Sequence, residues 1–260
     1  MLENIVIYKR SEVADKAKQY QLTQILKEAE ASTVHTSFRD ALAKPGFSLI
    51  AEIKRKSPSK GVIRKNFNAL ELARSYQSAG ASAISILADE HFFGVGVNYI
   101  KDVAASGHIQ LPILYKEFVI SEYQICEAAI VGASAVLLIV RILSDDELKR
   151  FIQLAHHLGL DALVETFTQE DVERALAAGA RIVGINNRDL NTFKTNFAHT
   201  AQLKRDIPED IITVTESGLH SHDDFTVMTE MGFDAALVGE AILKHDNVEH
   251  AIKGLLNNPL

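Results

Sequence analysis

Short apolar runs recur along most of the chain at fairly even intervals. They begin near Ser48, Ala81, Pro112, Ala135, Leu160, Arg181, Ile211 and Ala235. Between them lie amphipathic stretches with apolar residues at helical spacing, such as 69–80, 145–158, 169–178 and 223–231. The run 135–140 is apolar at every position, which is typical of a strand covered on both faces. The whole pattern predicts a series of strand-then-helix units, one for each run.

Several predicted helices are bounded by residues that start or stop a helix. Gly80, Gly132, Gly159, Gly179 and Gly232 follow amphipathic stretches. Glycine accepts the left-handed conformation that ends many helices, so we expect these positions to be C-terminal caps. Ser144 and Thr168 stand directly before acidic residues, as N-caps do.

The first 46 residues do not follow the strand–helix alternation. We expect residues 2–45 to be helical, with Ser11 as an N-cap and apolar positions at Leu22, Ile25 and Leu26. A second short helix is predicted over 38–43, before Pro45 and Gly46. The chain then reads as one domain, 1–260, with an N-terminal helical extension at 1–46 and the repeating units at 47–260.

The repeating units predict the fold class α/β, as a single (β/α)8 TIM barrel behind the N-terminal helical extension. The length of 260 residues suits such a barrel. An open doubly wound sheet is the alternative. We favour the barrel because no glycine-rich dinucleotide turn follows the first predicted strand.

Composition narrows the classes of function. The net charge is −7 and the pI is about 5.8, which argues against general nucleic-acid binding. The single cysteine, Cys126, forms no intrachain disulfide, and we expect it to be a small buried apolar residue. No apolar run is long enough for a membrane span, and the first residues lack a signal-peptide pattern. We therefore expect a cytoplasmic protein with no membrane partner.

Polar residues gather where the predicted strands end, which in a barrel is where the reactive groups collect. Side chains alternate along a strand, so Glu52 and Lys54 share one face, as do Lys116 and Phe118. Further strands end near Glu165, Asn186, Arg188 and Glu216. Solvated strand ends, or ion pairs that close the barrel, are the alternative explanation. Charges that converge in a partly buried place favour a functional site.

The last two predicted strands carry a second signal. Ser217 and Gly218 follow the seventh strand, and Gly239 and Glu240 follow the eighth. Loops at these two places often bind phosphate through backbone N–H groups, and glycine lets the backbone approach the anion. Ser57, after the first strand, adds a hydroxyl. The stretch 57–61 is either a lid with ligand contacts or a plain turn.

The same segments resemble the motifs of the indole-3-glycerol-phosphate synthase family. The resemblance is carried by 51–61, 84–87, 92–94, 116–118, 163–165, 184–190, 216–218 and 237–240, and it extends to the helical preface. It implies ring closure of 1-(2-carboxyphenylamino)-1-deoxyribulose 5-phosphate, with loss of carbon dioxide and water, in tryptophan biosynthesis. It also implies that the enzyme uses no metal and no organic cofactor, and that its partner is this small sugar-phosphate substrate.

The resemblance assigns roles to individual residues. Lys116 matches the general acid, Lys54 a second lysine, Glu165 an acid/base residue and Glu52 another required carboxylate. An ammonium group suits a ketone oxygen that gains negative charge, and a carboxylate suits the later removal of a proton. Which of these four groups acts in which proton step stays open. The remaining matched site positions are Asn186 and Glu216 in the catalytic set, and Ser57, Phe93, Phe118, Arg188, Leu190 and Ser217 toward the substrate.

The sequence departs from the family pattern in three places. Val95-Gly96-Val97 replaces a common Gly and Ser, so the substrate contacts of that loop stay open. Tyr115 stands where the family often has Arg, and alternation turns it away from Lys116. Glu240 stands where some members have Ser, and we expect only its backbone N–H to face the phosphate.

Three rival functions remain. A phosphoribosylanthranilate isomerase-like barrel would lack the long preface and the motif at 51–61. A catalytically silent sugar-phosphate binder would have lost the acid/base groups that are present here. A metal enzyme built on Glu52, Glu165 and Glu216 is the third, but the histidines have no recognisable ligand spacing. Oligomeric state is not encoded in any motif; we expect a monomer, with a dimer as the alternative.

Overall fold

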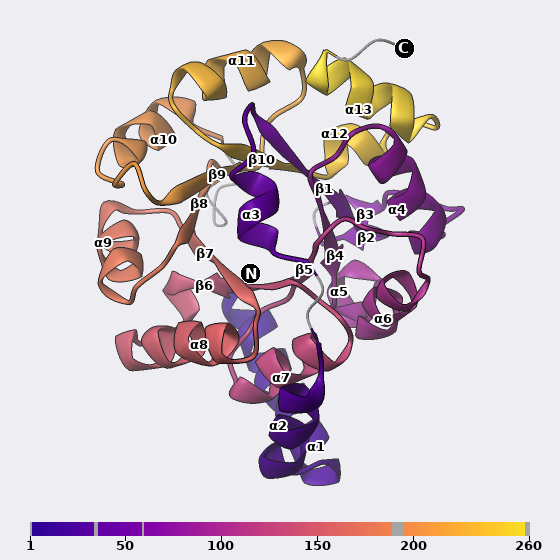
Figure 1. The fold of residues 1–260 in the computed structure, drawn as a ribbon, viewed down its shortest axis with the longest axis vertical. Coiled ribbons are helices and arrows are strands. Elements are labelled where there is room, and N and C mark those ends of the chain that lie inside the picture. Colours follow the sequence, from indigo (N-terminus) through magenta and orange to yellow (C-terminus); the bar gives the residue numbers. More distant parts are fainter. Residues whose placement is uncertain (1, 34–35, 59, 189–194, 258–260) are drawn as a thin grey trace.

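The computed structural model describes residues 2–33, 36–58, 60–188 and 195–257. Within them, parallel strands form a closed barrel in the order β1-β10-β9-β8-β7-β6-β5-β4 (Figure 1). The strands are β1 (Ser48–Ile53), β4 (Ala83–Leu87), β5 (Ile113–Lys116), β6 (Ala135–Ile139), β7 (Asp161–Thr166), β8 (Ile182–Asn186), β9 (Ile212–Glu216) and β10 (Ala235–Val238). Each begins within two residues of its predicted start, so the TIM-barrel prediction is confirmed.

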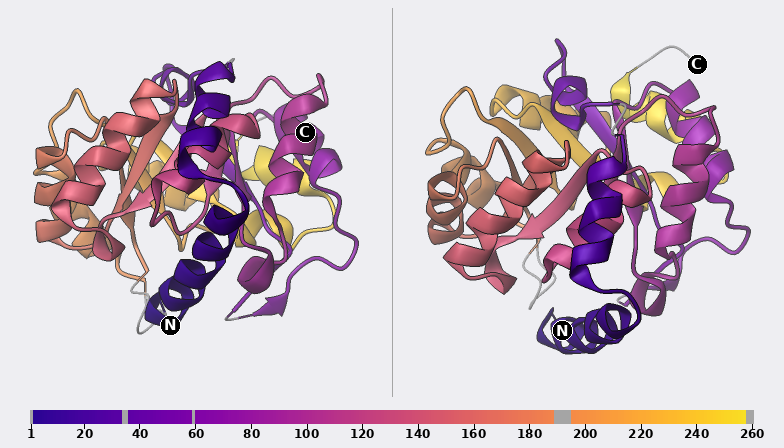
Figure 2. Two further views of the ribbon diagram at one scale, coloured as in Figure 1. Left: turned by 90° about the horizontal axis from the view of Figure 1, so that it is seen from below. Right: turned by 60° about the horizontal axis from the view of Figure 1, so that its bottom comes forward.

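Helices surround the barrel on the outside (Figures 1 and 2). They are α4 (Ala69–Ser78), α5 (Glu90–Phe93), α6 (Val97–Ala105), α7 (Glu122–Ile130), α8 (Asp145–His157), α9 (Gln169–Ala177), α10 (Phe197–Lys204), α11 (His222–Glu230), α12 (Glu240–Leu243) and α13 (Val248–Leu256). A 3-10 turn, η1 (Val140–Ile142), follows β6. The connection after β1 contains a small antiparallel hairpin of β2 (Lys56–Ser57) and β3 (Gly61–Val62).

The predicted helix boundaries are largely confirmed. Ser144 and Thr168 cap α8 and α9, each with a reciprocal capping box. The five glycines predicted to end helices all have positive φ, between 76° and 95°. Cys126 lies fully buried in α7, and burial raises the pKa of its thiol to about 11.

The extension consists of α1 (Leu2–Gln19), α2 (Leu22–Ala31) and α3 (Phe38–Leu42). Helices α1 and α2 pack beside α7 at one side of the barrel, while α3 lies across its end (Figures 1 and 2). The prediction of an N-cap at Ser11 is wrong, because α1 runs unbroken past it. Ile5, Val6 and Val13 give α1 a buried face that favours continuing the helix, and Ser11 is exposed.

Two apolar layers hold the fold together. Outward-facing strand residues such as Val136 and Leu138 pack against the helices. Inward-facing residues such as Leu137 fill the barrel, and Phe38 and Leu42 of α3 close it at the end where the strands begin. The plugged end leaves the opposite end, where the strands finish, as the open mouth. No helix of the described residues is long and apolar enough to cross a membrane.

Candidate active site

A pocket opens at the carboxyl ends of the barrel strands. All the predicted site residues that the structure describes line it: Glu52, Lys54, Ser57, Phe93, Lys116, Phe118, Glu165, Asn186, Arg188, Glu216, Ser217, Gly218, Gly239 and Glu240. Leu190 lies outside the described residues. The structure thus brings residues that are far apart in sequence to one cavity.

Lys116, at the end of β5, has its ammonium group between two buried carboxylates. Its Nζ lies 3.3 Å from Glu216 Oε2 and 3.5 Å from Glu52 Oε2. Burial alone would lower the pKa of Lys116, but Glu216, Glu52 and Glu165 together raise it above its ordinary value. The carboxylates therefore keep the ammonium charged. The side chain is 14% exposed and lines the pocket.

Glu52 links the two lysines. Lys54 Nζ donates to Glu52 Oε1 at 2.6 Å, and Lys116 approaches the other oxygen. Burial would raise the pKa of Glu52, but Lys54 and Lys116 lower it to about 2. Glu216 has the opposite shift: burial raises its pKa, and the neighbouring carboxylates Glu165 and Glu52 add to the effect against the attraction of Lys116. Two carboxylates in one pocket thus favour different protonation states.

Two glycines make room for these carboxylates. A Cβ at Gly184 would lie 2.3 Å from Glu216 Oε1, and a Cβ at Gly239 would lie 2.5 Å from Glu52 Oε1. Both separations are far below van der Waals contact. Gly239 was predicted from a phosphate argument alone, and the structure adds a second reason for a glycine there.

Glu165, Asn186 and Arg188 form the next part of the wall. Asn186 Nδ2 donates to Glu165 Oε1 at 3.3 Å, and Asn186 Oδ1 accepts from the backbone N–H of Arg188 at 3.0 Å. Arg188 Nε is buried without a hydrogen-bond partner among the described residues. An unused guanidinium donor in a pocket is suited to an anionic group of a ligand.

The rings of Phe93 and Phe118 lie side by side in the wall of the pocket. Their centroids are 6.2 Å apart with an interplanar angle of 30°. Phe93 ends α5, which follows β4, and Phe118 follows β5. Residues 95–97, where the sequence differs from the family pattern, fit into the fold without a rearrangement of the neighbouring elements. Val95 is fully buried, and α6 begins at Val97.

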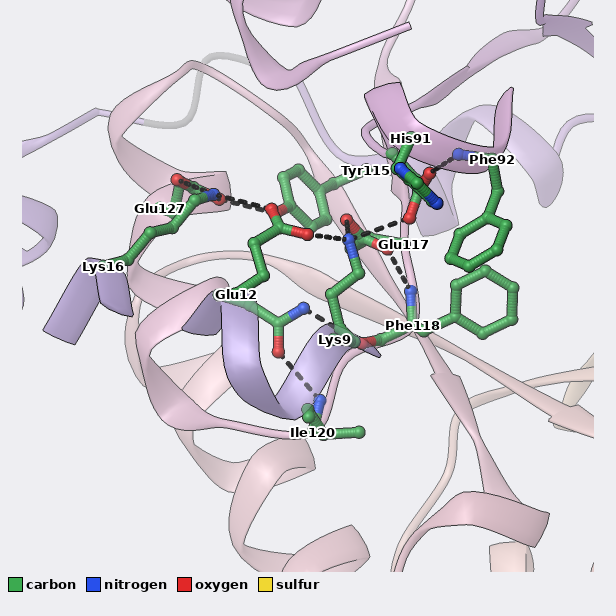
Figure 3. Close-up of polar contacts among 12 residues, drawn as sticks. Lys9, Glu12, Lys16, His91, Phe92, Tyr115, Glu117, Phe118, Ile120 and Glu127 are labelled. Carbon is green, nitrogen blue, oxygen red and sulfur yellow. Dashed lines mark hydrogen bonds and ion pairs between the residues drawn. The ribbon is translucent and has the colours of Figure 1, made fainter. Parts of the chain in front are cut away.

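The loops that carry these two rings are tied to α1 by a buried lysine (Figure 3). Lys9 Nζ lies 2.8 Å from Glu117 Oε2, 2.9 Å from Asp89 Oδ2 and 2.7 Å from Glu12 Oε2. Glu117 Oε1 accepts from the backbone N–H of Phe118 at 2.7 Å. Asp89 caps α5 by accepting from Phe92 N–H. We call these four residues, Lys9, Glu12, Asp89 and Glu117, the Lys9 cluster.

The Lys9 cluster has three carboxylates around one ammonium. Burial alone would lower the pKa of Lys9, but Glu117 and the other carboxylates raise it above its ordinary value. One positive charge does not offset three negative ones, so burial still raises the pKa of Glu117 to about 7 against the attraction of Lys9. This cluster was not predicted, because a lysine on a helix is ordinarily solvated.

Ser217, Gly218 and Glu240 lie at the side of the pocket formed by β9 and β10. Ser217 has φ 69° and Gly218 has φ 84°, so two left-handed residues follow each other. Glu240 pairs with Lys60 of the connection after β1. Burial would raise the pKa of Glu240, but its hydrogen bond with Lys60 lowers it.

The apolar residues that form the floor of the pocket were not predicted from the sequence. Leu87, Leu137, Ile139 and Leu237 line it from β4, β6 and β10. Strand alternation was the available signal, since Leu137 and Ile139 share the inward face of β6. Tyr115 was predicted to point away from Lys116, and it does: its hydroxyl donates to Glu127 Oε2 of α7 at 2.8 Å. Within the described ranges, no group of three or more His, Cys, Asp or Glu side chains is arranged to hold a metal ion.

A TIM barrel with lysines and carboxylates converging over an apolar floor at its mouth defines an acid–base enzyme for a small anionic substrate. The family model described as indole-3-glycerol phosphate synthase matches residues 2–255. The chain belongs to this family. It is accordingly a carbon–carbon lyase of the carboxy-lyase type in tryptophan biosynthesis.

Individual relatives agree over nearly the whole chain. A protein of Caldanaerobacter subterraneus named indole-3-glycerol phosphate synthase is 43% identical over 95% of this chain and 94% of its own length. One of Legionella pneumophila with the same name is 39% identical over 99% of both chains. Among solved structures, thiamine phosphate pyrophosphorylase from Pyrococcus furiosus matches with a TM-score of 0.62 and 14% identity. It covers 85% of this chain and 96% of its own, which supports the fold alone.

Proposed function

We propose that this pocket closes the indole ring on 1-(2-carboxyphenylamino)-1-deoxyribulose 5-phosphate, with Lys116 as the general acid. The observation that carries the proposal is the position of Lys116 Nζ between Glu52 and Glu216 at the open end of the barrel. Those carboxylates keep the ammonium charged. A charged donor facing the ketone oxygen stabilises the negative charge that develops there and then protonates it.

The proton balance of the reaction fits the remaining groups. Attack of the ring carbon on the ketone converts its oxygen to a hydroxyl, which takes one proton. The carboxylate leaves as carbon dioxide, and its bonding electrons stay with the ring. The hydroxyl takes a second proton and leaves as water, while the new five-membered ring gives up one proton. Two protons are therefore delivered and one is recovered, which suits Lys116 and Lys54 as donors and Glu165 as the acceptor.

The other residues of the pocket hold the substrate. Arg188, with a buried Nε that no described residue accepts from, would pair with the substrate carboxylate until it is lost. Phe93 and Phe118 would flank the anthranilate ring. The backbone at Gly218 and Gly239 would bind the phosphate, and the pairing of Glu240 with Lys60 reduces repulsion at that end. Asn186 would orient Glu165.

We also infer that one chain suffices for activity and that the protein works in the cytoplasm. One chain already brings the assigned acid, base and anion-binding groups into one pocket, so a monomer would hold all the groups that the proposal uses. A substrate and product of primary metabolism support the cytoplasm.

The direct test is to mix the purified protein with the carboxyphenylamino-deoxyribulose phosphate and record indole fluorescence. The chain contains no tryptophan, so its own signal in that range is low. We expect product formation that Glu165→Gln abolishes or strongly reduces. Substrate binding without product in the wild-type protein would favour the silent sugar-phosphate binder. Isomerisation of phosphoribosylanthranilate instead would favour the isomerase.

A further inference from the structure

Asn187 lies directly behind the proposed phosphate site without lining the pocket. It follows β8 and is only 2% exposed. Its backbone N–H donates to Glu216 O at 2.8 Å, and its side-chain Nδ2 donates to Ser217 O at 2.7 Å. A single residue therefore binds the carbonyl groups of two successive residues at the end of β9.

The orientation of the Asn187 amide follows from its partners. A backbone carbonyl only accepts hydrogen bonds, so the group that faces Ser217 O must be the NH₂. The same nitrogen donates to Thr215 Oγ1 at 2.9 Å, and on the other side Oδ1 accepts from the hydroxyl of Thr200 in α10. The amide is thus held on both sides, by a strand and by a helix.

The hydrogen bond to Ser217 O acts on an unusual piece of backbone. Ser217 has a left-handed φ of 69°, which costs energy for a residue with a Cβ, and Gly218 continues with φ 84°. The peptide between them is trans, so its C=O and N–H point in opposite directions. Because the carbonyl faces Asn187, the N–H of Gly218 points away from Asn187. Gly218 itself lines the pocket. That N–H has no acceptor among the described residues.

We propose that Asn187 is a positioning residue that aims the Gly218 N–H at the substrate phosphate. The inference rests on the proposed function, because it takes the turn at 217–218 as the phosphate site. Without the amide, the strained peptide at Ser217 is free to rotate, and its N–H no longer points at the anion. The residue then controls phosphate affinity from behind the site and does not touch the substrate.

The test compares neutral variants, because an acidic side chain near the phosphate would repel it directly. Asn187→Ser is too short to reach Ser217 O, and Asn187→Leu keeps the size without a donor. Thr200→Val is the matched control: it removes a hydrogen bond from the same buried network but leaves Nδ2 on Ser217 O. Inorganic phosphate serves as the binding probe, by calorimetry. The substrate and its dephosphorylated form serve as the kinetic probes.

We expect the Asn187 variants to bind inorganic phosphate about tenfold more weakly and to raise KM for the substrate about tenfold. The reason is that the Gly218 N–H loses its hydrogen bond to the charged phosphate. Their kcat should change much less, and their kcat/KM for the dephosphorylated form should not change. Thr200→Val should match the wild type in all three. A similar loss for both substrates, or Asn187 variants that bind inorganic phosphate as tightly as the wild type does, would overturn the role of Asn187. If the wild type itself neither bound phosphate nor preferred the phosphorylated substrate, the phosphate site, and Asn187 with it, would be wrong.

Discussion

Replacing Lys9 by methionine keeps the buried stem of the side chain but removes the ammonium from the Lys9 cluster (Figure 3). Asp89 and Glu117, both nearly fully buried, then lose their shared counter-charge. Breaking a buried ion pair from one side costs about 3–5 kcal/mol, because the remaining charge stays desolvated. We expect the variant to lose this much stability at alkaline pH.

The loss should depend on pH through Glu117. The pKa of Glu117 is about 7 in the folded protein, above the ordinary 4.5. Protonation of Glu117 therefore stabilises the folded protein fully below pH 4.5, and this stabilisation is lost as the pH rises through 7. Without Lys9 that pKa rises further. At about pH 8.5 the folded wild type ionises Glu117 beside Lys9, whereas the folded variant has to keep Glu117 protonated. Because pH 8.5 lies about 1.5 units above the wild-type pKa of about 7, this costs the folded variant about 2 kcal/mol more than the wild type. At about pH 5.5 Glu117 is protonated in both proteins, so this difference disappears.

Urea unfolding at the two pH values measures both parts of the effect. Lys18→Met is the matched control, because Lys18 pairs with Asp15 on the same helix in an exposed position and should matter by less than about 0.5 kcal/mol. Glu117→Gln added to Lys9→Met should restore part of the stability at alkaline pH. A loss that is equal at both pH values, or no larger than that of Lys18→Met, would refute the reasoning.

Three further predictions concern the pocket. Lys116→Met should keep its circular dichroism spectrum and lose about a thousandfold or more in kcat for indole formation; near-normal turnover would contradict its role as general acid. Gly239→Ala should reduce kcat about tenfold or more, since the new Cβ would lie 2.5 Å from Glu52 Oε1. Gly254→Ala in α13, where nothing lies within 4 Å, should leave kcat unchanged. Turnover should be the same before and after dialysis against a chelator, and a loss restored by a divalent metal would favour the metal enzyme.

The fold was predictable because its signals are local and repeated. Apolar runs such as 135–139 and capping residues such as Ser144 depend only on a few neighbouring residues. Strand alternation then placed Glu52 and Lys116 on inward faces, and closure of the barrel brought them within 3.5 Å. The start of α1 was misplaced because a serine fits both a cap and an exposed helix position.

The parts that were missed depend on contacts between distant segments. Nothing near Lys9 in sequence indicates that Asp89 and Glu117 will surround it. Asn187 was missed for the same reason. It stands between Asn186 and Arg188, which were both predicted to line the pocket, but its amide donates to the backbone carbonyl of Ser217 on a different strand end. Such residues look ordinary in sequence, because their environment is set by the tertiary fold alone.

The glycine at 184 has a consequence for how this pocket can vary among related enzymes. The carboxylate of Glu216 fills the space that a side chain at position 184 would need, since a methyl group there would lie 2.3 Å from Oε1. A relative that carries alanine at this position would have to shorten or displace the acid on the neighbouring strand. Whether position 184 can carry a side chain therefore depends on where the acid of the neighbouring strand is held, and a shorter residue at 216 would remove the conflict.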